Sequence, residues 1–116
     1  MSSPSSTDAR RPRGVAVLGS TGSIGRQTVD VLARHPGAFR VVALATGTNR
    51  DELDRQAAAV KPAVAVVGPD PDGLAELATR DDVDLVVVAT GGIVSLRPVV
   101  AALEAGKVVA LSLIHI

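Results

Sequence analysis

Three glycines at intervals of three residues, Gly19, Gly22 and Gly25, follow a short apolar run and open a helical pattern. In a dinucleotide-binding turn, the first glycine allows the sharp turn and the second lets the backbone approach a pyrophosphate. The third lets the helix pack closely on the strand, and the first N–H groups of the helix favour an anion. The strand–turn–helix context therefore predicts a nucleotide-binding turn at residues 19–25. The alternative is a glycine turn that serves packing alone.

Apolar strand patterns and helical patterns alternate along the rest of the chain, joined by short connections. The expected strands cover residues 14–18, 39–45, 63–67, 85–89 and 108–111, and the expected helices cover residues 24–33, 50–60, 74–79 and 95–105. Strands joined through helices pair in parallel with right-handed crossovers. A hydrophobic content of 47%, with Phe39 as the sole aromatic residue, suits a sheet covered by helices. The sequence predicts an α/β fold, a Rossmann-like doubly wound parallel sheet of about five strands that is incomplete, with ligand at the carboxyl ends of its strands.

Capping residues and apolar spacing predict how the helices begin and which face they bury. The helix at residues 24–33 is expected to bury a face made of Ile24, Thr28, Val31, Leu32 and Ala33. The helix at residues 50–60 is expected to begin after a cap at Asn49 or Asp51. Residues 68–73 are expected to form a loop before the next helix.

The end of the second expected strand carries no carboxylate, because the chain there reads Thr46-Gly47-Thr48-Asn49-Arg50. An Asp or Glu at this position would bind the ribose 2′-hydroxyl of NAD. Without it a 2′-phosphate is not repelled, and small donors together with Arg50 could bind it. The segment therefore favours NADP(H) over NAD(H). The alternative for Arg50 is a solvated residue in the first turn of a helix.

Other polar features indicate no second site. No Gly-Lys-Ser/Thr follows the glycines, which argues against a P-loop. The Thr-Gly-Gly run at residues 90–92 either borders the nicotinamide side of the cleft or is a helix-entry turn. The three aspartates within residues 81–84 precede a strand, so we expect a solvated turn opposite the cleft rather than a metal site. No carboxylate pair or nucleophile triad is expected on the cleft side.

Composition excludes several function classes. A formal net charge of +0 and the absence of Trp and Tyr argue against a nucleic-acid partner. The absence of Cys excludes a thiol nucleophile and a disulfide framework. No apolar run approaches the roughly 20 residues of a membrane span, and a cytoplasmic location is expected. Residues 1–13, rich in Ser, Pro and Arg, are expected to form a disordered lead-in rather than a targeting signal.

The run at residues 19–25 (GSTGSIG) closely resembles the amino-terminal motif of the 1-deoxy-D-xylulose 5-phosphate reductoisomerase family. The resemblance continues through residues 30–36, the second expected strand, Gly47-x-Asn49 and residues 96–107. It covers most of residues 15–111 and is more specific than a general Rossmann pattern.

This resemblance implies that residues 14–111 form an NADPH-binding domain. The residues implied to hold the cofactor are Thr21, Gly22, Ser23, Ile24, Gly47, Thr48 and Asn49, of which Thr48 is the least constant position. The whole enzyme rearranges and reduces deoxyxylulose phosphate, a small phosphosugar, to methylerythritol phosphate in isoprenoid precursor synthesis. It uses Mg²⁺ or Mn²⁺ bound by acidic residues of a later region, and it is a homodimer. We therefore expect no catalytic residue and no metal ligand here, and no activity from this chain alone.

The chain departs from the family pattern at two places. The stretch at residues 67–74 is shorter than in the family, which carries an extra helix and strand there. Residues 112–116 (SLIHI) stand where the family continues with an Ala-Asn-Lys-Glu-like segment, so we expect a non-native tail. Two other functions remain open: another NAD(P) enzyme, such as a semialdehyde or homoserine dehydrogenase, and a non-enzymatic nucleotide-sensing module.

Overall fold

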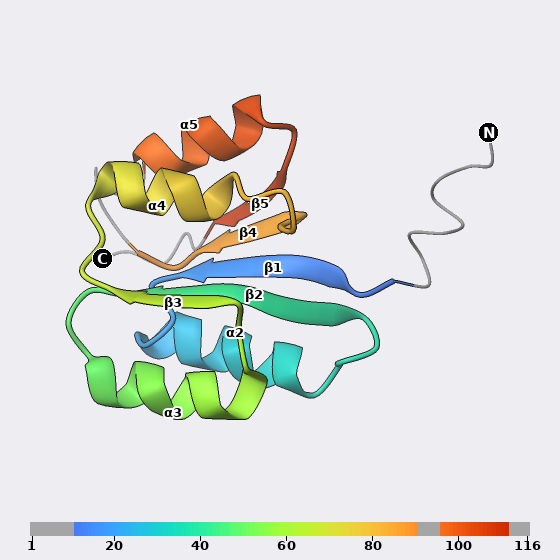
Figure 1. Cartoon of the computed structure of the whole chain (residues 1–116), viewed down its shortest axis with the longest axis vertical. Helices are drawn as coiled ribbons and strands as arrows, with labels where there is room; N and C mark the ends of the chain where they lie inside the picture. The colour runs from blue at the N-terminus through green and yellow to red at the C-terminus, as the bar shows by residue number, and fades with distance from the viewer. Residues whose placement is uncertain (1–10, 91–95, 112–116) are drawn as a thin grey trace.

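The computed structural model describes residues 11–90 and 96–111, which form a sheet between two layers of helices (Figure 1). The expectations for residues 1–10, for residues 91 and 92 and for the tail at residues 112–116 lie outside the described residues. The strands are β1 (Arg13–Leu18), β2 (Phe39–Thr46), β3 (Val64–Val67), β4 (Leu85–Val88) and β5 (Val108–Leu111). The helices are α2 (Ser23–Ala33), α3 (Arg50–Val60), α4 (Pro71–Ala78) and α5 (Leu96–Glu104).

All strand pairs in the sheet are parallel, and the strand order is β3-β2-β1-β4-β5. The chain runs outward from β1 to β3, then crosses back over the sheet to β4 and β5. Helices α2 and α3 cover one face, and α4 and α5 cover the other (Figure 1). The predicted doubly wound Rossmann-like fold is confirmed. Its order reverses between β1 and β4, the point at which such sheets bind ligands.

The central strand β1 separates two hydrophobic clusters. Val15 and Val17 pack with the buried face of α2 and α3, while Ala16 and Leu18 pack toward α4 and α5. This alternation is the ordinary two-residue period of a strand that is buried on both faces.

Strand β2 contains a bulge opposite the middle of β1. Val15 pairs with Val41, but Ala16 pairs with Ala43, so Val42 is an additional residue. Val42 and Ala43 consequently both belong to the cluster under α4 and α5. Nothing in the apolar run of β2 predicted this irregularity.

The buried face of α2 differs from the expected one. Its buried residues are Gly25, Val29 and Leu32, and Val29 is 3% exposed. Val31 is 45% exposed and Ala33 is also exposed, so placing these two on the buried face was wrong, whereas Leu32 is buried as expected. The helix docks through a residue without a side chain, Gly25, which adds nothing to a hydrophobic pattern.

Helix α4 begins at Pro71, three residues before the expected start. The Asp70 carboxylate accepts a hydrogen bond from the Gly73 N–H at 2.7 Å, and Pro71 occupies the first helical turn. An acidic cap followed by proline starts a helix, so the expected loop at residues 68–73 was too long. By contrast, α3 spans the expected residues and begins at the Asn49 cap, whose side-chain oxygen accepts from the Glu52 N–H at 3.1 Å.

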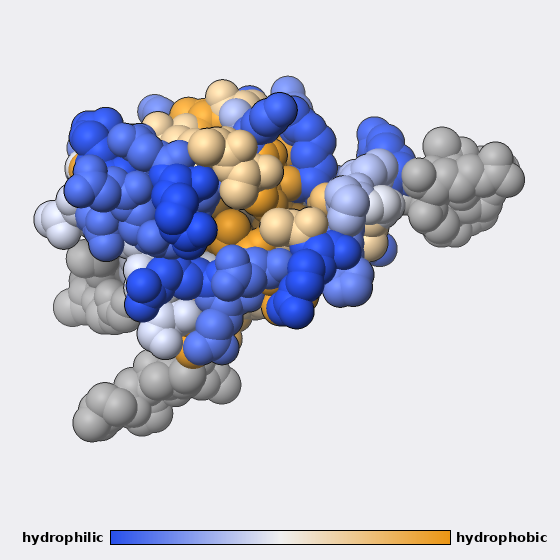
Figure 2. Space-filling model, turned by 90° about the horizontal axis from the view of Figure 1, so that it is seen from below, coloured by the Kyte–Doolittle hydropathy of each residue, from blue (hydrophilic) through white to orange (hydrophobic). Residues whose placement is uncertain are grey.

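Helices α2 and α3 leave an apolar hollow between them. A cavity of about 260 Å³ is lined by Leu32, Phe39 and Val60, among others. Figure 2, the view onto these two helices, shows hydrophobic surface between their hydrophilic outer faces. The buried face of α3 contains the polar residue Gln56 beside Leu53, so its apolar pattern is less regular than that of α2.

Candidate functional site

Two of the three glycines are required by the fold itself. Gly19 has a φ of +86°, a left-handed conformation that favours glycine. A Cβ at Gly25 would lie 2.0 Å from the carbonyl oxygen of Gly19, so only glycine allows α2 to approach the turn this closely. These two residues shape the turn between β1 and α2 as the sequence pattern predicted.

Gly22 is different, because the fold leaves room for a side chain there. Its φ is −74°, and a Cβ would have the Gly19 carbonyl oxygen, 3.9 Å away, as its nearest neighbour. Gly22 is exposed and is the N-cap residue of α2. The space in front of it is therefore open to a ligand, and a side chain would occupy that space.

The start of α2 offers unpaired backbone donors next to Gly22. The first bond of the helix runs from the Arg26 N–H to the Gly22 carbonyl at 2.8 Å. The N–H groups of Ser23, Ile24 and Gly25 consequently have no partner within the helix. Together with the helix dipole, they form a region suited to a phosphate group.

The second predicted segment, Gly47 to Asn49, lies at the same edge of the sheet as the glycine turn. The two segments are joined by a hydrogen bond between the hydroxyls of Thr21 and Thr46, at the end of β2. Gly47 and Thr48 are exposed, and the Asn49 side-chain oxygen is engaged in capping α3. The structure thus brings all seven predicted cofactor residues to the carboxyl edge of β1 and β2.

A cavity of about 90 Å³ opens at this edge, where β1, β2, β3 and β4 end. Its lining residues are Gly19, Ala45, Thr46, Gly47, Pro69, Leu74 and Thr90. None of these side chains is an acid or a base at neutral pH. The lining is apolar apart from two threonine hydroxyls and backbone groups, and it supplies no group for proton transfer.

Arg50 and Thr90 lie beside the site. Arg50 is exposed as the first residue of α3, next to the Asn49 cap. Thr90 lies against the turn, since a Cβ at Gly19 would approach its methyl group to 2.7 Å. Both positions are at the predicted edge of the sheet.

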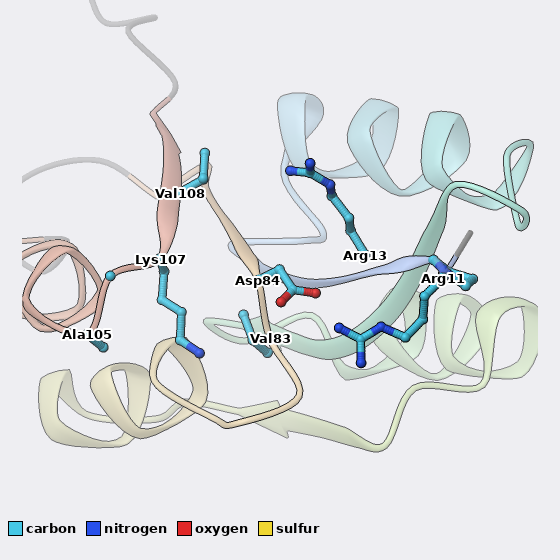
Figure 3. Close-up of a pocket in the computed structure, with 9 residues that line it drawn as sticks. Arg11, Arg13, Val83, Asp84, Ala105, Lys107 and Val108 are labelled. Carbon is cyan, nitrogen blue, oxygen red and sulfur yellow. The ribbon is translucent and has the colours of Figure 1, made fainter. Parts of the chain in front are cut away.

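The opposite edge of the sheet holds a larger cavity of about 300 Å³, with Arg11, Arg13, Asp84 and Lys107 in its lining (Figure 3). The Asp84 carboxylate accepts a hydrogen bond from the Gly14 N–H at 2.9 Å, and the Lys107 ammonium donates to the Arg80 carbonyl at 2.9 Å. In Figure 3 the Arg13 and Lys107 side chains extend in opposite directions. The first bond ties the residue before β4 to β1, and the second ties the residue before β5 to the connection after α4, so we assign this cavity to packing.

The aspartates of residues 81–84 lie at this amino edge, as their sequence position predicted. Asp82 forms an ion pair with Arg80 at 2.9 Å, and this hydrogen-bonded guanidinium lowers the pKa of the Asp82 carboxyl. Within residues 11–90 and 96–111, no three His, Asp or Glu side chains gather closely enough to hold a metal ion. None of the helices in this described part has the length and apolar character needed to span a bilayer.

One residue of the site was missed by sequence reasoning. Gln56 of α3 is buried, and its Nε2 donates a hydrogen bond to the Ser20 carbonyl of the glycine turn at 2.8 Å. The signal was present, because Gln56 follows the buried Leu53 by three residues on the same helix face. A polar residue at a buried helical position requires a partner.

Family comparison points to one group of enzymes. Residues 15–71 and 67–113 match a family described as 1-deoxy-D-xylulose 5-phosphate reductoisomerase. The two matched segments overlap at residues 67–71. The overlap falls at the short connection between β3 and α4.

Curated relatives carry the same description. The chain is 43% identical to 1-deoxy-D-xylulose 5-phosphate reductoisomerase of Thermomicrobium roseum over an alignment 113 residues long, gaps included. This alignment covers 85% of this chain and 29% of the relative. It is 39% identical to the chloroplastic enzyme of Mentha piperita over an alignment 123 residues long, gaps included. This alignment covers 87% of this chain and 26% of the relative. The chain therefore spans less than a third of these relatives.

Solved structures agree in fold. The reductoisomerase from Zymomonas mobilis in complex with NADPH has a TM-score of 0.77 at 30% identity, covering 87% of this chain and 32% of that one. A DOX-P reductoisomerase in complex with magnesium has a TM-score of 0.80 at 29% identity, covering 87% of this chain and 30% of that one. Biliverdin reductase from Synechocystis in complex with NADP⁺ has a TM-score of 0.67 at 23% identity, which shows a shared fold alone.

Proposed function

The chain belongs to the 1-deoxy-D-xylulose 5-phosphate reductoisomerase family, and we propose that residues 13–111 are the NADPH-binding domain of such an enzyme. The observation that carries this proposal is the contrast among the three glycines. Gly19 and Gly25 are required by the fold, whereas Gly22 faces open space that a Cβ would narrow. A glycine that the protein itself does not need is explained by a ligand that approaches the backbone there.

In this proposal, the cofactor residues fall into two groups. Thr21, Gly22, Ser23 and Ile24 bind the pyrophosphate through backbone N–H groups and hydroxyls at the start of α2. Gly47, Thr48 and Asn49 bind the ribose carrying the 2′-phosphate. The absence of a carboxylate at the end of β2 supports NADPH rather than NADH.

NADPH supplies a hydride when it is bound, and the residues of this chain hold and orient it. We propose that the whole enzyme reduces and rearranges deoxyxylulose phosphate to methylerythritol phosphate with a divalent metal, Mg²⁺ or Mn²⁺, as a cytoplasmic homodimer. Solved relatives in complex with magnesium and with fosmidomycin support the metal and a small-molecule substrate. The cavity at the carboxyl edge is lined by no acid or base, so we expect binding without turnover from this chain alone.

A titration of the purified chain with NADPH and NADH tests the proposal. We expect NADPH to bind more tightly and to raise the unfolding temperature in a concentration-dependent manner. Arg13 is the first residue of β1 and belongs with the domain. Residues 1–12 and 112–116 are proposed to lie outside the binding domain, so a chain of residues 13–111 should bind equally well. Equal affinity for both nucleotides would contradict the assigned 2′-phosphate preference, and no binding of either would overturn the proposal.

A further inference from the structure

Gln56 makes a contact that links two distant parts of the molecule. It lies on α3, is 2% exposed, and its Nε2 donates to the Ser20 carbonyl oxygen, 36 positions earlier in the chain, at 2.8 Å. A carbonyl only accepts, so the NH₂ side of the amide faces Ser20. The Gln56 Oε1 has no hydrogen-bond partner among the described residues. Among the described residues, the bond to the Ser20 carbonyl is therefore the hydrogen bond through which this buried amide acts.

The backbone around Ser20 is held from two sides. The N–H groups of Gly19 and Ser20 both donate to the Ala45 carbonyl of β2, at 2.8 and 2.9 Å. The Ser20 carbonyl is held by Gln56 of α3. The turn is thus fixed by the β2–α3 unit and not only by its own glycines.

This bond also determines the direction of a donor in the proposed cofactor site. The described peptide bonds are all trans, and in a trans peptide the carbonyl and the following N–H point in opposite directions. Holding the Ser20 carbonyl toward α3 therefore directs the Thr21 N–H away from α3. Thr21 is among the residues assigned to the pyrophosphate, and its hydroxyl is held by Thr46.

We propose that Gln56 is a positioning residue for the nucleotide: acting through the Ser20 carbonyl, it orients the Thr21 N–H for the pyrophosphate. Because α3 begins directly after Gly47–Asn49, Gln56 also fixes the glycine turn relative to the segment assigned to the 2′-phosphate. This inference rests on the proposed NADPH binding. The inference goes beyond the proposed binding because it assigns a role to a side chain that is buried and remote from the open edge of the site.

Two substitutions separate positioning from packing. Gln56→Met keeps the length of the side chain and removes the donor, and Gln27→Met, on the exposed side of α2, is its matched control. Gln56→Glu can donate to the Ser20 carbonyl only while its carboxyl is protonated. Burial raises the pKa of such a carboxyl, so the variant keeps this donor at the acid end of the range and loses it as the pH rises.

The experiment measures the dissociation constant for NADPH from about pH 6 to about pH 8.5 as a ratio to the wild-type value, which cancels the ionisation of the cofactor. We expect Gln56→Met to weaken binding about tenfold at every pH, with Gln27→Met unchanged. We expect Gln56→Glu to bind nearly as well as wild type at the acid end and progressively less well as the pH rises. Circular dichroism at each pH confirms that the variants are folded.

Wild-type affinity in Gln56→Met, or a ratio for Gln56→Glu that does not change with pH, would overturn the positioning role while leaving the proposed function intact. Should Gln56→Met fail to fold, the pH profile of Gln56→Glu decides alone. A wild-type chain that does not bind NADPH would overturn the proposed function, and this inference with it.

Discussion

Gly25 of α2 lies so close to Gly19 that a Cβ on Gly25 would come within 2.0 Å of the Gly19 carbonyl oxygen. The contact joins the start of a helix to the end of the central strand, and both partners are backbone. Neither side can move without displacing β1, whose residues 15–18 are buried on both faces. This single approach sets how deeply α2 is seated on the sheet.

Gly25→Ala should therefore destabilise the fold severely. A methyl group that overlaps backbone cannot be accommodated by a rotamer change, and we expect a loss of about 3 kcal/mol or more in the free energy of unfolding. Urea denaturation measures it. Gly37→Ala is the control, because a Cβ there meets nothing within 4 Å. A stability of Gly25→Ala within experimental error of Gly37→Ala would show that α2 can move away from the sheet.

Gly22→Ala should separate folding from binding. The backbone at Gly22 is in a region open to all residues, and a Cβ fits, so we expect a stability change of about 1 kcal/mol or less. The same methyl group should weaken NADPH binding about tenfold or more, because it occupies the approach of the pyrophosphate. Calorimetric titration beside thermal unfolding gives both values. Unchanged affinity in a folded Gly22→Ala chain would remove the main support for the cofactor site.

Thr48→Asp should shift the nucleotide preference from NADPH toward NADH. The new carboxylate would stand at the exposed end of β2, where it can accept from a ribose 2′-hydroxyl and repels a 2′-phosphate. We expect the ratio of NADPH to NADH affinity to fall about tenfold or more. Thr48→Asn, similar in size but neutral, should leave the ratio near the wild-type value. A similar fall in both variants would mean that the effect is steric rather than electrostatic.

The Glu52–Arg55 pair at the start of α3 should make a small, acid-sensitive contribution to stability. The Arg55 guanidinium, hydrogen-bonded to Glu52, lowers the pKa of that carboxyl below its ordinary value of 4.5. A lowered pKa in the folded state means that the stabilisation is present at neutral pH and is lost as the pH falls through the folded-state value. The unfolding midpoints of wild type and Glu52→Gln should accordingly differ at pH 7 and converge in acid.

A double-mutant cycle with Arg55→Gln checks this prediction. If the pair acts as a unit, Arg55→Gln should remove the same increment, and the double variant should lose little more. Because the pair is at the surface, about 1 M salt should reduce the difference by screening. A midpoint difference that persists unchanged in acid would assign the effect to helix propensity instead.

Much of the fold was accessible from sequence because the signals were local. The glycine turn, the Asn49 cap and the apolar runs each act within a few residues, and they predicted the β1–α2 unit, the start of α3 and all five strands. The cofactor segments could be placed together because parallel strands end at the same edge of a sheet.

The parts that sequence did not predict depend on contacts between distant elements. Val31 and Val29 are equally hydrophobic, and the docking of Gly25 on the turn buries the helix face that carries Val29 and Leu32. The spacing of Gln56 from Leu53 indicated a buried position, but its partner, the Ser20 carbonyl, is a backbone atom that no residue type identifies. The Asp70 cap was local and recognisable, but the neighbouring prolines and glycines suggested a loop.

The bulge in β2 has a consequence for how this sheet tolerates changes in chain length. Val41, Ala43, Leu44 and Ala45 alternate between the two hydrophobic clusters once Val42 is removed from the series. Deleting Val42 would therefore leave all the remaining residues of β2 opposite their present partners on β1 and facing their present clusters. Deleting one residue from a buried strand normally turns the side chains on one side of the deletion to the opposite face of the sheet. Deleting Val42 would instead preserve the facing of the side chains on both sides.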